Sequence, residues 1–261
     1  FRAPVGVALG LRSALAAPPG KVDPPPAARL LKGPVYELRI YVANEDRFQH
    51  LIKRFRDHTD RIFRKHGLAP MGYWITTEGR GSKGRRFVYV LKHPSRYAAY
   101  RNWNSFTRDR EWEAVLDIPE FQRLLAEKPT SIFMTENDYS AASMDAIEKA
   151  GGVYELRTYI AGPGKLDKLN ARFRDHTTRL FTKHGIRNVG YWTPFDMPEA
   201  ANTLIYLVHH ASREQADASW MAFGQDPLWR KVARESRVDG RLLSKPPERI
   251  YLKPMAFSPL K

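Results

Sequence analysis

The sequence predicts an α+β protein of two tandem ferredoxin-like repeats, whose sheets pack against each other as the two halves of an α/β barrel. The first observation is a duplication: RFRDHTDRIFRKHG at residues 54–67 returns as RFRDHTTRLFTKHG at residues 172–185, with eleven of fourteen positions identical. The flanking VYELR and GYW segments also return, each displaced by 118 residues. Second, each copy has the element order of a split βαβ unit. Third, strand residues such as Tyr73 and Trp74 need a surface to cover them, and the other sheet is the nearest candidate.

The duplication divides the chain into four parts. Residues 34–138 and 153–258 are the two repeats, and the small, polar, glycine-ended segment 139–152 links them. Residues 1–33 form a basic arm, rich in Pro and Ala, with a single acidic residue. Closure of the barrel within one chain and closure between two chains are both compatible with this organisation.

The arm allows two interpretations. Arg2 and Arg12, among small apolar residues and followed by Ser13, resemble the tail of a mitochondrial presequence. An ordinary disordered arm is the alternative, and the proline clusters favour an extended chain in either case.

Each repeat begins with a strand and a long helix. Residues 35–43 alternate in character, which predicts a strand with one apolar face. The side chains expected on that face are Tyr36, Leu38, Ile40 and Val42, and those on the other face are Glu37, Arg39 and Tyr41. A helix of about six turns follows, because apolar residues recur every three or four positions from Phe48 to His66. We expect Asn44 to cap this helix, and Pro163 to occupy the first position of its second copy.

The remaining elements are marked by turn residues. Both long helices end in Lys-His-Gly, where Gly67 and Gly185 suit the left-handed residue that closes a helix. A hairpin follows in each copy, and then a helix that Ser95 can cap in the first. We expect a further short helix at residues 118–127 and a closing strand at residues 130–136.

The long helix, the opening Tyr-Glu-Leu-Arg-x-Tyr and the Gly-Tyr-Trp of both copies resemble the NIPSNAP family. The resemblance covers residues 34–258. It implies a pseudo-dimer of the dimeric α/β-barrel type, mitochondrial residence, and a role in protein association and mitochondrial quality control. It implies no established catalytic residue. The chain departs from the family in its strongly basic balance and its Pro-rich arm.

The repeated histidines are the first candidates for a site, because barrels related to this family include haem-degrading enzymes. His58 and His176 are weak candidates for ligand or cofactor binding, whereas His66 and His184 suit a role at the helix end. Asp57 and His58 point about 100° apart on a helix, so Asp57 is expected to pair with Arg61 instead of forming a dyad.

No metal-binding spacing of histidines or carboxylates occurs on either long helix, so the sequence predicts neither a metal nor a cofactor, and no catalytic residue. The candidate interaction residues are the basic side chains of the arm and of the first hairpin tip, where an acidic surface could dock. These are Arg2, Arg12, Arg80, Lys83, Arg85 and Arg86.

Composition limits the function classes. The net charge of +15 suits anionic partners, but the basic residues are spread over both repeats. The absence of cysteine excludes disulfides and thiolate sites. No apolar run reaches the roughly 20 residues of a membrane-spanning helix, although proximity to a membrane surface stays open.

The expected function is therefore that of a non-catalytic, mitochondrial accessory subunit, on the matrix side, in a respiratory-chain or ATP-synthase complex. Three alternatives stay open: a mitochondrial ribosome subunit that contacts rRNA, a small-ligand or haem-binding enzyme of the dimeric-barrel class, and a mitophagy or protein-association adaptor.

Overall fold

A computed structural model describes residues 33–79, 84–140 and 151–261. The first repeat comprises β1 (Val35–Val42), α2 (Phe48–Arg54), η1 (Phe55–Thr59), α3 (Asp60–Lys65), β2 (Ala69–Thr76), β3 (Arg86–His93), α4 (Arg96–Thr107), α5 (Arg110–Asp117), η3 (Pro119–Phe121) and β4 (Thr130–Glu136). The second comprises β5 (Val153–Ile160), α6 (Leu166–Arg172), η4 (Phe173–Thr177), α7 (Thr178–Lys183), β6 (Arg187–Pro194), η5 (Ala200–Asn202), β7 (Thr203–His210), α8 (Arg213–Gln225), α9 (Pro227–Glu235) and β8 (Glu248–Pro254). The predicted fold class is confirmed.

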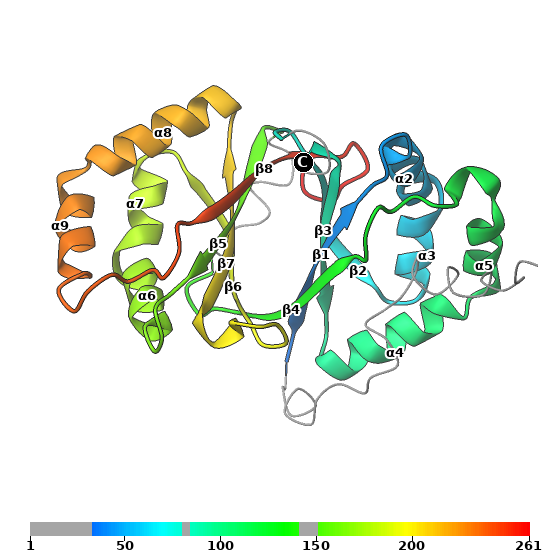
Figure 1. Ribbon diagram of the computed structural model, residues 1–261, viewed down its shortest axis with the longest axis horizontal. Coiled ribbons are helices and arrows are strands. Elements are labelled where there is room, and N and C mark those ends of the chain that lie inside the picture. The colour runs from blue at the N-terminus through cyan, green and yellow to red at the C-terminus, as the bar shows by residue number, and fades with distance from the viewer. Residues whose placement is uncertain (1–32, 80–83, 141–150) are drawn as a thin grey trace, which may run out of the picture.

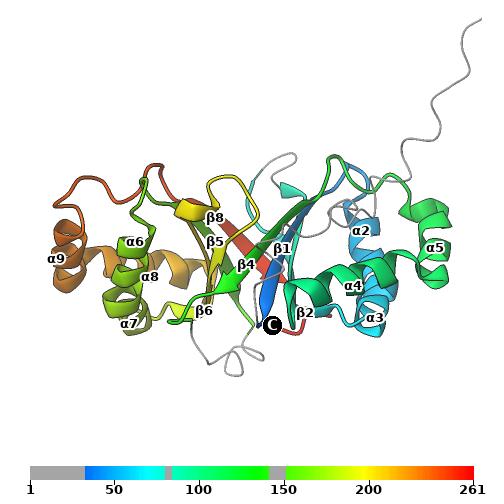
Figure 2. The ribbon, with the colours of Figure 1, turned by 90° about the horizontal axis from the view of Figure 1, so that it is seen from below.

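The strands form one closed antiparallel barrel within this chain, in the order β1-β3-β2-β8-β5-β7-β6-β4. Each repeat supplies a ferredoxin-like half, and the halves meet where β4 pairs with β6 and β8 pairs with β2. The helices of the first repeat cover one side of the barrel and those of the second repeat cover the other (Figures 1 and 2). The barrel is therefore closed within one chain, an alternative that the sequence left open.

The alternation of each strand separates two kinds of core. Tyr36 and Leu38 point into the barrel, where they pack with residues of both repeats such as Trp74 and Trp192. The opposite faces pack under the helices, in one aromatic core for each repeat. The expected faces of β1 are confirmed: Glu37 and its neighbours on that face lie beneath the helices.

The shared Gly-Tyr-Trp segment has a packing reason. The indole of Trp74 lies across Gly72, and a Cβ at residue 72 would come within 2.3 Å of that ring. Gly190 and Trp192 repeat this contact. Glycine thus lets each tryptophan lie flat inside the barrel.

The long helix of each repeat differs from the uninterrupted α-helix that we expected. A π-helical turn, η1 or η4, interrupts it in the middle, at the sequence FRDHT in both copies. The hydroxyl of Thr59 donates to the carbonyl of Arg54 at 3.1 Å, five residues earlier, and Thr177 does the same to Arg172 at 3.0 Å. Each bond ties the end of the π turn to the α-helical turn before it.

After β4 and β8, the chain crosses onto the other repeat. Ser258 Oγ accepts the backbone N–H of Tyr73 at 2.9 Å, and Ser140 Oγ accepts that of Tyr191 at 2.7 Å. Phe257 packs on the Tyr73 ring and Tyr139 packs on the Tyr191 ring. Each repeat is thus held by the segment that follows the last strand of the other repeat. We call these two contacts, Ser258 with Phe257 on Tyr73 and Ser140 with Tyr139 on Tyr191, the reciprocal clasps.

Three local expectations are wrong. Asn44 does not cap the first long helix; its amide donates to the carbonyls of Arg123 and Leu125. The second long helix begins at Leu166, after a turn that contains Pro163. In place of a helix at residues 118–127, a single 3₁₀ turn covers Pro119–Phe121. The cap at Ser95 is confirmed, as are the left-handed Gly67 and Gly185.

Candidate functional site

The structure separates the histidine candidates from one another. His58 and His176 occupy the π turns of opposite repeats, both half-buried, and His58 packs edge-on against Phe121 with ring centroids 5.5 Å apart. No hydrogen bond joins either ring to another described residue. The expected pair of Asp57 with Arg61 is wrong, because Asp57 pairs with Arg56 and Arg61 with Glu111.

The basic interaction candidates are only partly described. Arg2, Arg12, Arg80 and Lys83 lie outside the described residues. Arg85 and Arg86 are half-buried at the base of the first hairpin. Arg85 donates to the carbonyl of Ala43 at 3.3 Å, so its guanidinium is engaged by the fold.

A buried carboxylate organises the space between sheet and helices in the first repeat. Glu37 is fully buried, and its oxygens accept four side-chain hydrogen bonds. The donors are Arg39 at 3.0 Å, Trp103 at 2.7 Å, Ser131 at 2.8 Å and His93 at 3.2 Å. Burial alone would raise the pKa of Glu37, but Arg39, His93 and Trp103 outweigh it and lower this pKa to about 2.

The second repeat holds the matching network. Glu155 accepts from Arg157 at 3.1 Å, from Trp220 at 2.6 Å and from His210 at 3.2 Å. The position of Ser131 is taken by Arg249, as the strand registers show. Both networks are enclosed by the packed helices, so we assign them to holding sheet and helices together.

These networks are only partly visible in the sequence. Glutamate and arginine recur on the first strand of each copy, and the tryptophans recur at an offset of 117. The sequence does not show that residues from four elements converge on the carboxylate of Glu37.

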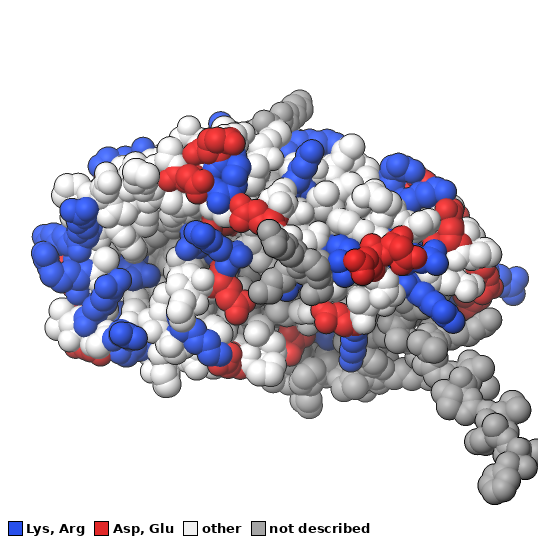
Figure 3. Space-filling model, turned by 45° about the horizontal axis from the view of Figure 1, so that its top comes forward, with Lys and Arg blue, Asp and Glu red and all other residues white. Residues whose placement is uncertain are grey.

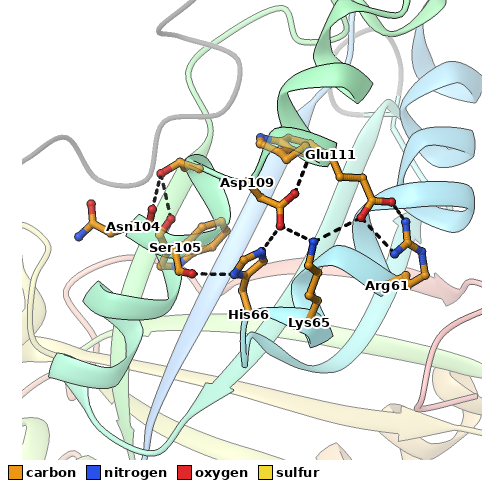
Figure 4. Close-up of polar contacts among 10 residues, drawn as sticks. Arg61, Lys65, His66, Asn104, Ser105, Asp109 and Glu111 are labelled. Atoms are coloured by element: carbon orange, nitrogen blue, oxygen red, sulfur yellow. Dashed lines mark hydrogen bonds and ion pairs between the residues drawn. The ribbon is translucent and has the colours of Figure 1, made fainter.

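An open groove of about 700 Å³ lies on the outer side of the first repeat, where the end of α3 meets α4 and α5. It is lined by His66, Tyr100, Arg101, Asn104, Ser105, Arg108 and Asp109. Figure 4 shows the imidazole of His66 between the hydroxyl of Ser105 and the carboxylate of Asp109. The distances are 2.7 Å from Nδ1 to Ser105 Oγ and 2.6 Å from Nε2 to Asp109 Oδ2.

Asp109 is held in its charged form by its surroundings. Its Oδ2 also pairs with Lys65 at 2.6 Å, and its Oδ1 accepts the backbone N–H groups of Glu111 and Trp112 as the N-cap of α5. Hydrogen bonds from Lys65 and His66 lower the pKa of Asp109 to about 2. The ring of His66 thus contacts the aspartate that caps the next helix, where the sequence suggested a role at the end of its own helix.

The second repeat keeps the aspartate and histidine but lacks the serine and the two arginines of the groove. His184 Nε2 meets Asp226 Oδ2 at 2.8 Å, and Lys183 meets the same oxygen at 2.7 Å. At an offset of 117, four polar residues of the first groove are replaced by uncharged residues. Arg101, Asn104, Ser105 and Arg108 correspond to Ala218, Met221, Ala222 and Gln225.

A second surface difference lies on the last helix of each repeat. The exposed positions of α9 carry Arg230, Lys231 and Arg234, and α5 carries Glu113, Ala114 and Asp117 in their place. On the face drawn in Figure 3, Lys and Arg gather at the end of the molecule that carries α9 (left). Exposed Leu228 and Val238 lie in the same segment.

Within the described residues, no group of three or more His, Asp or Glu side chains is arranged to hold a metal ion. The helices described there also include none that is long and apolar enough to cross a membrane.

The NIPSNAP family model matches residues 36–140 and 154–259, once for each repeat. The search of curated protein sequences finds no match. Among solved structures, an anthrone oxidase-like protein is similar with a TM-score of 0.55 and 11% identity, over 86% of this chain and 92% of that one. A "putative monooxygenase" from Lactobacillus acidophilus gives 0.53 and 12%, over 85% and 94%.

A NIPSNAP family protein of unknown function from Agrobacterium tumefaciens matches a single repeat, with a TM-score of 0.38, 23% identity, and coverage of 43% of this chain and 96% of its own. The two likenesses with a TM-score above 0.5 establish the fold, a barrel of the dimeric α/β type, and at these identities they leave the chemistry to the residues of this chain.

Proposed function

The chain belongs to the NIPSNAP family, and we propose that it works as an accessory, structural subunit of a large mitochondrial assembly. A respiratory-chain or ATP-synthase complex is the preferred assembly, on the matrix side of the inner membrane. In this proposal the barrel is a rigid body, and the work of the protein is done by its outer surface.

The basic end of the second repeat, defined by Arg230, Lys231, Arg234 and Arg237, is the observation that carries the proposal. These four side chains are exposed, and Leu228 and Val238 expose apolar surface among them. Apolar surface beside a predominantly basic group of side chains suits docking on a complementary acidic protein surface. The corresponding residues of the first repeat, such as Glu113 and Asp117, do not provide such a surface.

The packed interior supports a role of this kind. Large side chains from both repeats, including Trp74, Trp192 and Tyr154, fill the barrel and are at most 1% exposed. The spaces between sheets and helices hold the two aromatic cores and the networks of Glu37 and Glu155. Such an interior stabilises a fixed shape, which a structural subunit requires.

The proposal is tested by isolating the protein gently from mitochondria and measuring the mass and composition of the particle with which it migrates. We expect comigration with a respiratory or ATP-synthase particle. Comigration with an rRNA-containing particle would replace this assembly with the ribosomal alternative, and capture in autophagic complexes would favour the adaptor. Migration near the mass of the chain itself would overturn the subunit proposal.

A pair of double variants tests the docking surface. Changing Arg230→Glu with Arg234→Glu should release the protein from its particle, because both charges then repel an acidic partner. Arg101→Glu with Arg108→Glu makes the same change in net charge on the first repeat and should leave the association intact. Release by the second pair alone would show that the basic end is not the docking surface.

A further inference from the structure

We propose that the groove of the first repeat is a hydrolytic site in which Ser105 is the nucleophile, His66 the general base and Asp109 the group that orients the base. This inference goes beyond the proposed subunit role and does not depend on it. A nucleophile, a base within hydrogen-bond reach and a third group that orients the base are the parts that covalent hydrolysis needs.

The hydrogen bonds fix the proton on the required nitrogen. Asp109 is ionised, since Lys65 and two backbone N–H groups bind its oxygens, so the N–H of His66 lies at Nε2 and donates to Asp109. Nδ1 therefore carries a lone pair, and it lies 2.7 Å from Ser105 Oγ. The hydroxyl can then donate to the imidazole, as a nucleophile does before attack. Ser105 is exposed to the groove, whereas His66 and Asp109 are 12% and 6% exposed.

The second repeat shows which part of this arrangement the fold needs. There, His184, Asp226 and Lys183 repeat the contacts of the helix junction, and alanine stands in place of the serine. The junction is therefore built without a hydroxyl. A serine stands at this position in the first repeat only, and it occurs together with the polar groove lining.

The lining indicates the class of substrate. Arg101 lies one turn before Ser105 on α4, and Arg108 is the residue that caps the end of this helix, three positions after Ser105. Both line the groove around Ser105. Both are exposed, and neither forms an ion pair with another described residue. Guanidinium groups bind carboxylate and phosphate, and their N–H groups can also stabilise an oxyanion. We assign as substrate a small acyl ester that carries an anionic group.

The reaction balances with water as the only co-reactant. Ser105 Oγ attacks the ester carbonyl while its proton passes to His66 Nδ1, and the tetrahedral intermediate then expels the alcohol, which takes that proton. Water next attacks the acyl-serine, His66 again accepts a proton, and the carboxylic acid leaves as Ser105 recovers its hydrogen. Asp109 stays ionised throughout and stabilises the imidazolium.

The first test is covalent labelling of the full chain with a fluorophosphonate probe, followed by peptide mass spectrometry. We expect modification at Ser105, and we expect Ser105→Ala and His66→Gln to abolish it. His184→Gln is the matched control, since it removes the same helix-junction contact from the repeat without a serine, and labelling should persist. Absence of label on Ser105 in the wild-type protein would overturn the proposal.

The second test compares hydrolysis of 4-nitrophenyl acetate with that of the anionic 4-nitrophenyl hydrogen succinate. The anionic ester should have the higher kcat/KM, and Arg101→Gln with Arg108→Gln should remove that preference. His66→Gln should lower kcat/KM by about 10² to 10⁴-fold, the usual range for loss of a general base, while His184→Gln leaves it unchanged. Equal losses in both histidine variants would mean that His66 acts only through the fold, and the assignment of the base would fail.

Discussion

The exposed side of α5 in the first repeat carries Glu113 and Asp117, whereas α9 in the second repeat carries Arg230 and Arg234 at the same positions. In the interior, however, Glu37 and Glu155 meet the same set of arginine, tryptophan and histidine partners. The duplication has thus kept what is buried and changed what faces solvent. Buried polar groups must keep their partners to avoid a desolvation cost, but exposed residues carry no such constraint.

The groove of the first repeat shows most clearly how the two repeats share buried contacts and differ in exposed residues. His66 and His184 tie equivalent helices to equivalent aspartates, yet the hydroxyl and the two arginines occur only in the first repeat. A residue that packing does not require, but that completes a chemical arrangement, is a better candidate for function than one that both copies share.

The largest effect is expected from removing the buried carboxylates. Glu37→Ala leaves the guanidinium of Arg39 buried without its carboxylate, which should lower the free energy of unfolding by about 3–5 kcal/mol. Glu155→Ala should cost less, because Arg157 is 12% exposed and water can solvate part of its charge. Urea unfolding of both variants measures the difference, with exposed Glu235→Ala as the control within about 0.5 kcal/mol. Equal losses would indicate that the two networks are energetically the same.

An intermediate effect is expected at the reciprocal clasps. Ser258→Ala leaves the N–H of Tyr73 without its acceptor in a buried place and should cost about 1–3 kcal/mol. Ser140→Ala should lie at the lower end of this range, since Ser140 is half-buried and water can replace its hydroxyl. Exposed Ser105→Ala is the control, with a change below about 0.5 kcal/mol in the same urea measurement. A clasp variant as stable as this control would show that its clasp is dispensable.

The smallest difference is expected between the two helix junctions. The pKa of Asp109 is lowered to about 2, so its contribution to stability is present above its unfolded pKa of about 3.8 and is lost as the pH falls through 2. Asp109→Asn keeps a capping side chain but removes the charge, and should cost about 1 kcal/mol at pH 7 and nothing below pH 2. The pKa of Asp226 is lowered too, by hydrogen bonds from Lys183 and His184, so Asp226→Asn should behave alike.

Thermal unfolding from pH 7 to pH 2 measures both junction variants. The wild-type melting temperature should fall more steeply below pH 4 than that of either variant. If only one variant reduced the fall in melting temperature below pH 4, the two junctions would differ in their contribution to stability in spite of their matching contacts.

Much of the fold could be predicted from local patterns. The repeat gave the number of units, the alternation of β1 gave its two faces, and Lys-His-Gly gave the end of each long helix. Two of the errors share a cause: Asn44 and Pro163 are good starting residues, but the chain beside them forms a turn first and the helix begins later. The π turn escaped prediction because one extra residue in a turn barely changes the apolar spacing.

The candidate site was predictable only in part. His66 was noticed because it recurs, but its partners Ser105 and Asp109 lie 39 and 43 residues away along the chain. Ser105 does not recur in the second repeat, so the duplication does not mark it.

The sequence by itself determined the duplicated unit, its element order and the burial of its apolar faces, because periodicity and turn residues act over a few neighbouring positions. The tertiary structure alone decided that the barrel closes within one chain, that four elements converge on Glu37, and that α4 brings Ser105 against His66. These contacts depend on how helices pack on a sheet and on one another. Packing of this kind joins residues far apart in the chain and leaves no local pattern.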